Sequence, residues 1–133
     1  MLVGAAALAA TPVIGQEAPS LSLELNALQP TESGCRVTFV ATNRLGAELE
    51  KSAVEIALFG ADGGIERLVS LDFRTMPDGK TRVLQFDLAD LACDGVSRVL
   101  VNDIVACEGE GIEPRACLDR LETRTATTVA FGT

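Results

Sequence analysis

Short runs in which apolar and polar residues alternate, each followed by turn-forming residues, constrain the fold of this chain more than any other feature. Such runs recur from Leu21 onward, whereas apolar residues at helical spacing are scarce. Alternation with a period of two is typical of strands that bury one face. The expected strands lie within seven segments, which are residues 21–25, 37–41, 54–58, 69–73, 84–88, 98–102 and 121–131. The chain is therefore expected to be all β.

Turn residues between these runs predict chain reversals. Residues 30–34 read PTESG, residues 60–64 read GADGG and residues 76–79 read MPDG. Seven short strands with such turns predict a seven-stranded, antiparallel, immunoglobulin-like β-sandwich of two sheets, with a closed barrel as the alternative. The chain has no tryptophan or tyrosine, so leucine, valine, isoleucine and five phenylalanines would fill the core. The pair Asn102-Asp103 interrupts an apolar run and predicts a β-bulge or a bend that re-aims the strand toward Cys107.

Four cysteines are present, none of them in a C-x-x-C motif: Cys35, Cys93, Cys107 and Cys117. An even number predicts two disulfides, and four cysteines allow three pairings. In a seven-stranded sandwich the loops after the first and fifth strands lie at one end, and the loop after the sixth lies at the other. Cys35 would therefore pair with Cys93, and Cys107 with Cys117. Metal binding by the cysteines is disfavoured because the chain has no histidine.

The N-terminal residues 2–14 form a run of small and apolar residues without a charged side chain, LVGAAALAATPVI. This length suits the apolar region of a signal peptide and is shorter than the roughly 20 residues that span a bilayer. We expect residues 1–15 to be a signal peptide with a truncated basic region, cleaved before Gln16. Residues 16–133 would then form a single sandwich domain, periplasmic or secreted, with no stable membrane anchor in the mature chain.

The composition argues against several classes of function. Without histidine, the chain lacks the usual general base and the usual partner of a serine or cysteine nucleophile. The net charge of −8 disfavours nucleic acid and anionic lipid as partners. Without tyrosine or tryptophan to stack on a sugar, an enzyme that uses carboxylates alone is the least favoured hypothesis. We expect no catalytic residue, no cofactor and no metal ligand.

Two acidic segments are candidates for binding. Residues 108–116, EGEGIEPRA, lie between the last two cysteines, and an irregular, tethered loop at the end of a sandwich commonly carries recognition. The predicted partner-binding residues in this loop are Glu108, Glu110, Ile112, Glu113 and Arg115. The leading hypothesis is a non-enzymatic binding or scaffolding module that acts on another envelope protein. The alternative is a Ca²⁺ or small-molecule carrier that uses Asp87, Asp90 and Asp94, although their spacing is not that of an EF-hand.

Two resemblances to known proteins support the expectation of an extracytoplasmic domain. Residues 54–64, VEIALFGADGG, resemble the FxLYD type of extracytoplasmic sandwich, with Phe59 in place of tyrosine and Gly60 in place of aspartate. The chain is also similar to a group of small secreted alphaproteobacterial proteins labelled as Tat-pathway signal proteins. That similarity rests on residues 35–43, 85–88 and 91–95 and on the late cysteine pair. It implies a location in the cell envelope, although the chain has no twin-arginine pair.

Overall fold

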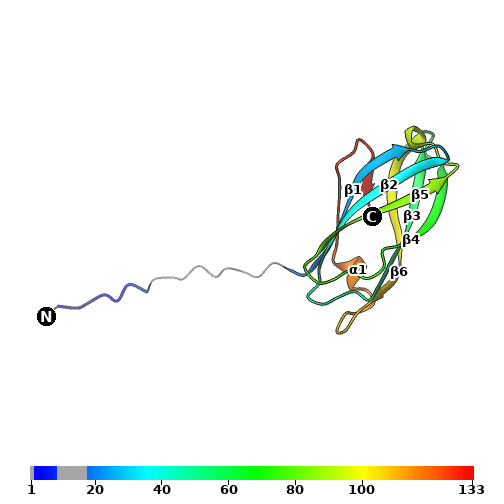
Figure 1. Ribbon diagram of the computed structural model, residues 1–133. Helices are drawn as coiled ribbons and strands as arrows, with labels where there is room; N and C mark the ends of the chain where they lie inside the picture. Colours follow the sequence, from blue (N-terminus) through cyan, green and yellow to red (C-terminus); the bar gives the residue numbers. More distant parts are fainter. Residues whose placement is uncertain (1, 9–17) are drawn as a thin grey trace.

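Two four-stranded sheets face each other in the computed structural model, which describes residues 2–8 and 18–133 (Figure 1). The first sheet has the order β5-β2-β1-β7, with bounds Thr81–Ala89, Gly34–Arg44, Ser20–Pro30 and Leu121–Thr125. The second has the order β4-β3-β6-β8, with bounds Ile65–Asp72, Lys51–Gly60, Val96–Glu108 and Ala130–Gly132. Two short helices interrupt the loops, the 3-10 helix η1 (Cys93–Gly95) and α1 (Ala116–Asp119).

The N-terminal residues 2–8 contain no helix or strand and are exposed. The expected cleavage site before Gln16, and with it much of the predicted signal peptide, lies outside the described residues. No helix in residues 2–8 and 18–133 has the length and apolar character needed to span a membrane.

The core lies between the sheets and follows the alternation of the sequence. Leu21, Leu23 and Leu25 of β1 are buried, and each buried leucine of this kind stabilises the fold by roughly 1.5 to 3 kcal/mol. At the centre, the ring centroid of Phe39 lies 5.5 to 6.2 Å from three other phenylalanine rings, those of Phe73, Phe86 and Phe131. The expectation that all five phenylalanines fill the core is wrong for Phe59, which is half-exposed and lies under the guanidinium of Arg98.

The last segment of the chain differs from the sequence prediction. Residues 121–131 form two strands, β7 and β8, which belong to different sheets, so the described residues contain eight strands and not seven. The hydroxyls of Thr125 and Thr127 accept hydrogen bonds from the backbone N–H groups of Thr127 and Val129, and these local bonds reverse the chain. β7 then pairs parallel with β1, and β8 parallel with β6, so the sandwich is not wholly antiparallel.

The predicted bulge at Asn102 is confirmed. Glu55 of β3 pairs with Asp103 of β6, but the next residue, Ile56, pairs with Val101, which leaves Asn102 outside the ladder. The side chain of Asn102 instead donates a 2.7 Å hydrogen bond to the carboxylate of Glu55. The bulge allows residues on both sides of it to keep their apolar faces toward the core.

The disulfides confirm the predicted pairing. Cys35 bonds to Cys93 at one end of the sandwich, and Cys107 bonds to Cys117 at the other, with Cα atoms 5.1 and 6.0 Å apart. In the loop-entropy description, closing the longer loop stabilises the fold by about 4 kcal/mol and closing the shorter one by about 3 kcal/mol. Two disulfides indicate an oxidising, non-cytoplasmic environment.

Candidate functional site

The stapled loop, residues 108–116 between Cys107 and Cys117, is fixed to the end of the sandwich. The backbone N–H of Glu50 donates a 2.7 Å hydrogen bond to the carbonyl of Glu108. Gly109 lies so close to a neighbouring segment that an added Cβ would be 2.3 Å from the carbonyl oxygen of Glu48. Glycine at residue 109 therefore lets the backbone of the loop pack against residues 48–50.

Within the loop, local hydrogen bonds define two turns. The N–H of Ile112 donates to the carbonyl of Gly109 at 3.1 Å, around Gly111, whose φ of +72° favours glycine. The N–H of Ala116 donates to the carbonyl of Glu113 at 2.9 Å, at the start of α1. The loop is thus held by a disulfide at its ends, by backbone hydrogen bonds inside it and by packing on one side.

The five residues predicted to bind a partner divide into two groups. Glu108, Glu110, Glu113 and Arg115 are exposed, whereas Ile112 is half-buried and packs against the core. As the only large apolar residue of the loop, Ile112 is predicted from the sequence to contact a partner. In the structure this side chain packs against the domain and is only partly exposed.

Ile112 contributes to a shallow hollow of about 280 Å³ next to the stapled loop. Its apolar lining comes from Pro19, Leu45, Ile112 and Ala116, and its charged lining from Glu113, Asp119 and Arg120. Pro19 directly precedes β1, so the chain enters the sandwich at this same end (Figure 1). One apolar side chain of a bound molecule would fit such a hollow.

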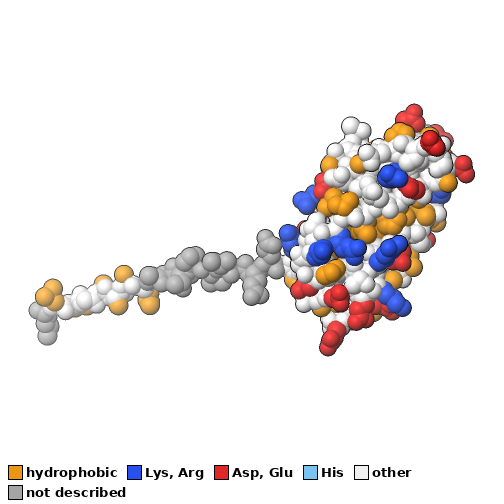
Figure 2. Space-filling model, viewed as in Figure 1, with side chains coloured by type: hydrophobic (Ala, Val, Ile, Leu, Met, Phe, Trp, Pro, Cys, Tyr) orange, Lys and Arg blue, Asp and Glu red, His pale blue; other side chains and the backbone are white. Residues whose placement is uncertain are grey.

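Negative charge surrounds the hollow. Segments 45–51 and 108–120 together carry six carboxylates, those of Glu48, Glu50, Glu108, Glu110, Glu113 and Asp119. The same segments carry three basic side chains, and two of these lie near carboxylates of the same region: Lys51 is 3.7 Å from Glu108 and Arg115 is 3.8 Å from Asp119. Figure 2 shows acidic side chains gathered at the end of the domain from which the loop projects. This end therefore attracts cationic groups.

Comparisons with protein-family models, curated proteins and solved structures found no match for this chain.

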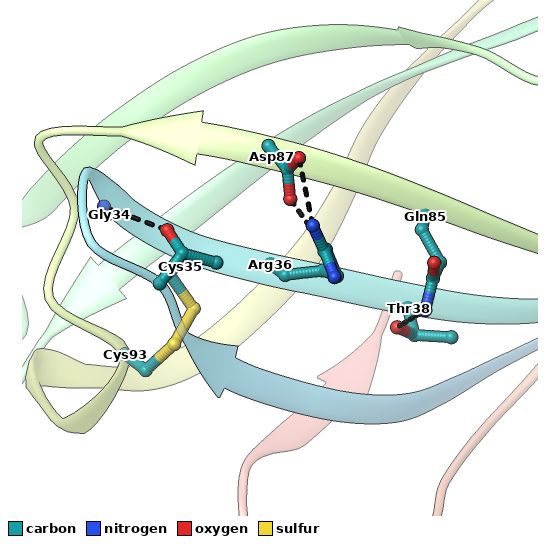
Figure 3. A network of polar contacts seen from close by, with 8 residues as sticks. Gly34, Cys35, Arg36, Thr38, Gln85, Asp87 and Cys93 are labelled. Carbon is teal, nitrogen blue, oxygen red and sulfur yellow. Dashed lines mark hydrogen bonds and ion pairs between the residues drawn. A yellow bond between two sulfur atoms is a disulfide. The ribbon is translucent and has the colours of Figure 1, made fainter.

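At the opposite end, an ion pair lies beside the Cys35–Cys93 disulfide, and Figure 3 shows its two side chains pointing toward each other from β2 and β5. Arg36 donates to the two carboxylate oxygens of Asp87 at 2.7 and 3.3 Å. This hydrogen bonding lowers the pKa of Asp87 from its ordinary value and raises that of Arg36. The carboxylate of Asp87 is thus already paired with Arg36 of the neighbouring strand, on the surface of the sheet.

The other two aspartates of the calcium hypothesis have separate environments. Asp90 adopts a φ of 59° at the end of β5, and its N–H donates to the carbonyl of Ser33 at 2.8 Å. Asp94 is exposed in η1 and lines a different hollow of about 480 Å³. Among residues 2–8 and 18–133, no group of three or more carboxylate, cysteine or histidine side chains is arranged to hold a metal ion. The arrangement of Asp87, Asp90 and Asp94 around one ion is therefore not found.

The residues that complete the hollow were not predictable from the sequence. Pro19 and Leu45 come from segments about 65 to 95 residues away from the stapled loop in the sequence, and neither belongs to a recognisable motif. Gly109 was the available signal for close packing of the loop, because a glycine inside a clipped loop often marks a close backbone approach.

Proposed function

We propose that this protein is a non-enzymatic binding module of the periplasm or the extracellular space. In this proposal an immunoglobulin-like sandwich presents the stapled loop to another protein of the cell envelope. The observation that carries the proposal is the combination of a fixed loop with exposed carboxylates and an apolar hollow beside it. A surface that is already ordered before binding loses little conformational entropy when a partner docks.

The proposed partner offers a basic segment that contains one apolar side chain. The apolar side chain would enter the hollow over Leu45 and Ile112, and lysine or arginine side chains would lie near Glu110 and Glu113. Because these carboxylates are exposed, they would act mainly by steering the partner, and association would slow as salt is added. Affinity would come from the apolar contact in the hollow.

An envelope location fits this proposal. The two disulfides need an oxidising compartment, and the apolar run at residues 2–14 has the length and composition of a signal sequence. The charged groups of the stapled loop are exposed, so they are available to a partner in that compartment.

Cross-linking in intact cells tests the proposal. The test variant is Glu110→Lys with Glu113→Lys, and the control is Glu32→Lys with Asp94→Lys, which makes the same change in charge at exposed positions at the other end of the sandwich. We expect the wild type and the control to be joined to the same protein, and the loop variant to lose it. Equal capture by both variants would show that the loop is not the binding site. Absence of any captured protein with the wild type would argue against a binding module.

A second measurement uses the captured partner in purified form. The association rate with the wild type should fall as salt increases, and the rate with the loop variant should be lower and less dependent on salt. A salt dependence shared equally by the two proteins would assign the steering charge to another part of the surface.

A further inference from the structure

Strands β4 and β5 lie along one side of the sandwich, drawn in green and yellow-green in Figure 1. β4 is the end strand of the second sheet and β5 is the end strand of the first, so in the described part of the chain each has a strand neighbour on one side only. We call their two free sides the open side of the sandwich. The free side of an edge strand offers N–H and C=O groups to a strand of another molecule.

Exposed apolar side chains accompany these free backbone groups. The N–H of Phe73, next to the end of β4, points to the β3 side, and that of Asp90, next to the end of β5, points to the β2 side. Because N–H and C=O groups alternate in direction along a strand, those of Leu68 and Val83 point to the open side. The side chains of these two residues are 53% and 64% exposed. Both edges therefore have features of strands that pair with other molecules.

The two edge strands also share a sequence pattern. Residues 67–72 read RLVSLD and residues 82–87 read RVLQFD, so in each strand four uncharged residues lie between an arginine and an aspartate. Uncharged segments with high β propensity pair readily with copies of themselves. Charged residues that flank such a segment oppose this pairing.

Arg67 and Arg82, which we call the edge arginines, lie in the core-facing rows of their strands. Arg67 pairs with Leu58 and Arg82 pairs with Ala41, and both of these partners are fully buried. Residues opposite each other in an antiparallel pair lie on the same face of the sheet. The alternation of the sequence would place an apolar side chain at each position, and a half-buried arginine occupies it instead.

Each edge arginine bonds to the backbone near the far end of the other edge strand. The Nη2 of Arg67 donates a 2.7 Å hydrogen bond to the carbonyl oxygen of Ala89, the last residue of β5. The Nη1 of Arg82 donates to the carbonyl oxygen of Thr75, three residues beyond the end of β4. The two guanidinium groups thus cross from one sheet to the other at opposite ends of the open side. Within residues 2–8 and 18–133, neither of them forms an ion pair.

We propose that the edge arginines keep the open side from pairing with a second copy of this chain. A strand added to β4 or β5 would extend the sheet and cover the core-facing row of that edge, together with its arginine. The guanidinium group would then lose its contact with water, and burial of a charge without a partner is costly. An inward-pointing charge on an edge strand therefore opposes edge-to-edge association. This role is separate from the binding role proposed for the stapled loop.

A second copy is the strand donor that this device excludes. It brings the same two edges, and antiparallel pairing of two β5 strands would place the uncharged residues 83–86 of both copies in contact. The apolar side chain of Val83 favours this pairing, and the charge of Arg82, which directly precedes it, opposes the pairing.

Analytical ultracentrifugation of Arg67→Leu with Arg82→Leu tests the proposal. Leucine continues the apolar row, so the variant should fold, which circular dichroism and thermal melting check. The variant should associate at a concentration at least about tenfold below that of the wild type, although its more negative net charge disfavours association. Arg67→Lys with Arg82→Lys keeps the charge in both rows and should remain as monomeric as the wild type. If the double leucine variant does not fold, each single leucine variant gives the same test on one edge.

Arg44→Leu is the control for the new apolar side chain, because Arg44 is exposed at the end of β2 and lies outside the core-facing row. This control should remain monomeric. Amide hydrogen exchange locates the contact in the associated leucine variant, where the N–H groups of Leu68 and Val83 should exchange more slowly than in the wild type.

Three results would overturn the proposal. The first is a leucine variant that associates no more than the wild type or Arg44→Leu. The second is a lysine variant that associates as the leucine variant does, because the charge would then not be the protecting feature. The third is association that leaves exchange at Leu68 and Val83 unchanged, because the contact would then lie outside the open side.

Discussion

The side chain of Asn43 donates a 2.9 Å hydrogen bond to the backbone carbonyl of Met76, and Asn43 is fully buried. Its Nδ2 also donates to the carbonyl of Ala47 at 2.9 Å, and its Oδ1 accepts from the N–H of Leu45 at 3.0 Å. Met76 in turn forms a β-bridge with Leu49. One buried amide therefore holds the segment that lines the hollow and contacts the stapled loop.

Replacing this amide should strongly destabilise the domain. Asn43→Ala leaves the carbonyl of Ala47 and the N–H of Leu45 without their partner and removes one of the two hydrogen bonds to the carbonyl of Met76, which also accepts from the N–H of Leu49. We expect a loss of about 2 to 4 kcal/mol in the free energy of unfolding. Urea denaturation of the oxidised protein measures this loss. Asn26→Ala, at the exposed residue of the β1 bulge, is the control and should change the free energy by less than about 0.5 kcal/mol. Similar losses for both variants would contradict the role given to Asn43.

The strands of the sandwich were predictable where burial follows alternation. Leu21, Leu23 and Leu25 point into the core as expected because the polar residues between them point outward. The same reasoning failed for residues 121–131, because the hydroxyls of Thr125 and Thr127 reverse the chain and β propensity gives no sign of that.

The candidate site was predictable only as a loop. The cysteine positions and the order of the strands were enough to place residues 108–116 at one end and to pair Cys107 with Cys117. The hollow was not predictable, because Pro19 and Leu45 reach it through tertiary packing. The same packing half-buries Ile112, whose sequence neighbours are all polar or glycine.

Removing each disulfide should have a different effect. Cys35→Ser with Cys93→Ser opens the longer loop and should lower the free energy of unfolding by about 4 kcal/mol, whereas Cys107→Ser with Cys117→Ser should lower it by about 3 kcal/mol. Denaturation with urea under non-reducing conditions gives both values. A loss near zero for the first variant would show that the cross-link between the β2 start and η1 does not constrain the unfolded chain.

Limited proteolysis distinguishes opening of the stapled loop from unfolding of the whole sandwich when the Cys107–Cys117 disulfide is removed. Trypsin can cut after Arg115, which is exposed in the stapled loop. The variant without Cys107 and Cys117 should be cut faster at this position, because the loop opens without unfolding of the sandwich. The variant without Cys35 and Cys93 should be cut there at the wild-type rate under conditions where it remains folded. Equal rates for all three proteins would show that the disulfide does not order the loop.

The ion pair between Arg36 and Asp87 should make a small contribution to stability that depends on pH. Hydrogen bonding from Arg36 lowers the pKa of Asp87 in the folded protein. The contribution is therefore fully present above the unfolded-state pKa of about 3.9 and is lost as the pH falls through the lower folded-state pKa. Both side chains are well exposed, 42% and 60%, so solvent and salt weaken the pair.

Thermal melting of Asp87→Asn against the wild type measures this contribution. The wild type should melt slightly higher between pH 5 and pH 8, and the two melting temperatures should converge in acid below the ordinary aspartate pKa of about 3.9. Asp94→Asn is the control, because Asp94 has no ion pair among the described residues. The ion pair needs the ionised carboxylate of Asp87. A difference in melting temperature between wild type and Asp87→Asn that grows in acid would therefore contradict this prediction.

The backbone of Gly109 lies directly against the backbone of Glu48, with no room for a side chain. In Gly109→Ala the new methyl group would lie 2.3 Å from the carbonyl oxygen of Glu48 and 3.1 Å from the Cγ1 of Ile112. Backbone atoms cannot move aside as a flexible side chain does, so the loop must shift away from the sandwich. We expect a loss of about 1 to 3 kcal/mol in the free energy of unfolding, and weaker binding of any ligand that uses the hollow.

Gly95→Ala is the matched control for this substitution. Its new methyl group would meet only the Cβ of Ala92, at 3.9 Å, which is an ordinary van der Waals contact. This variant should keep the stability of the wild type within about 0.5 kcal/mol. Urea denaturation of the two alanine variants therefore isolates the contact from the general effect of replacing glycine. If Gly109→Ala were as stable as Gly95→Ala, the loop would not be packed against Glu48, and the hollow would lose one of its fixed walls.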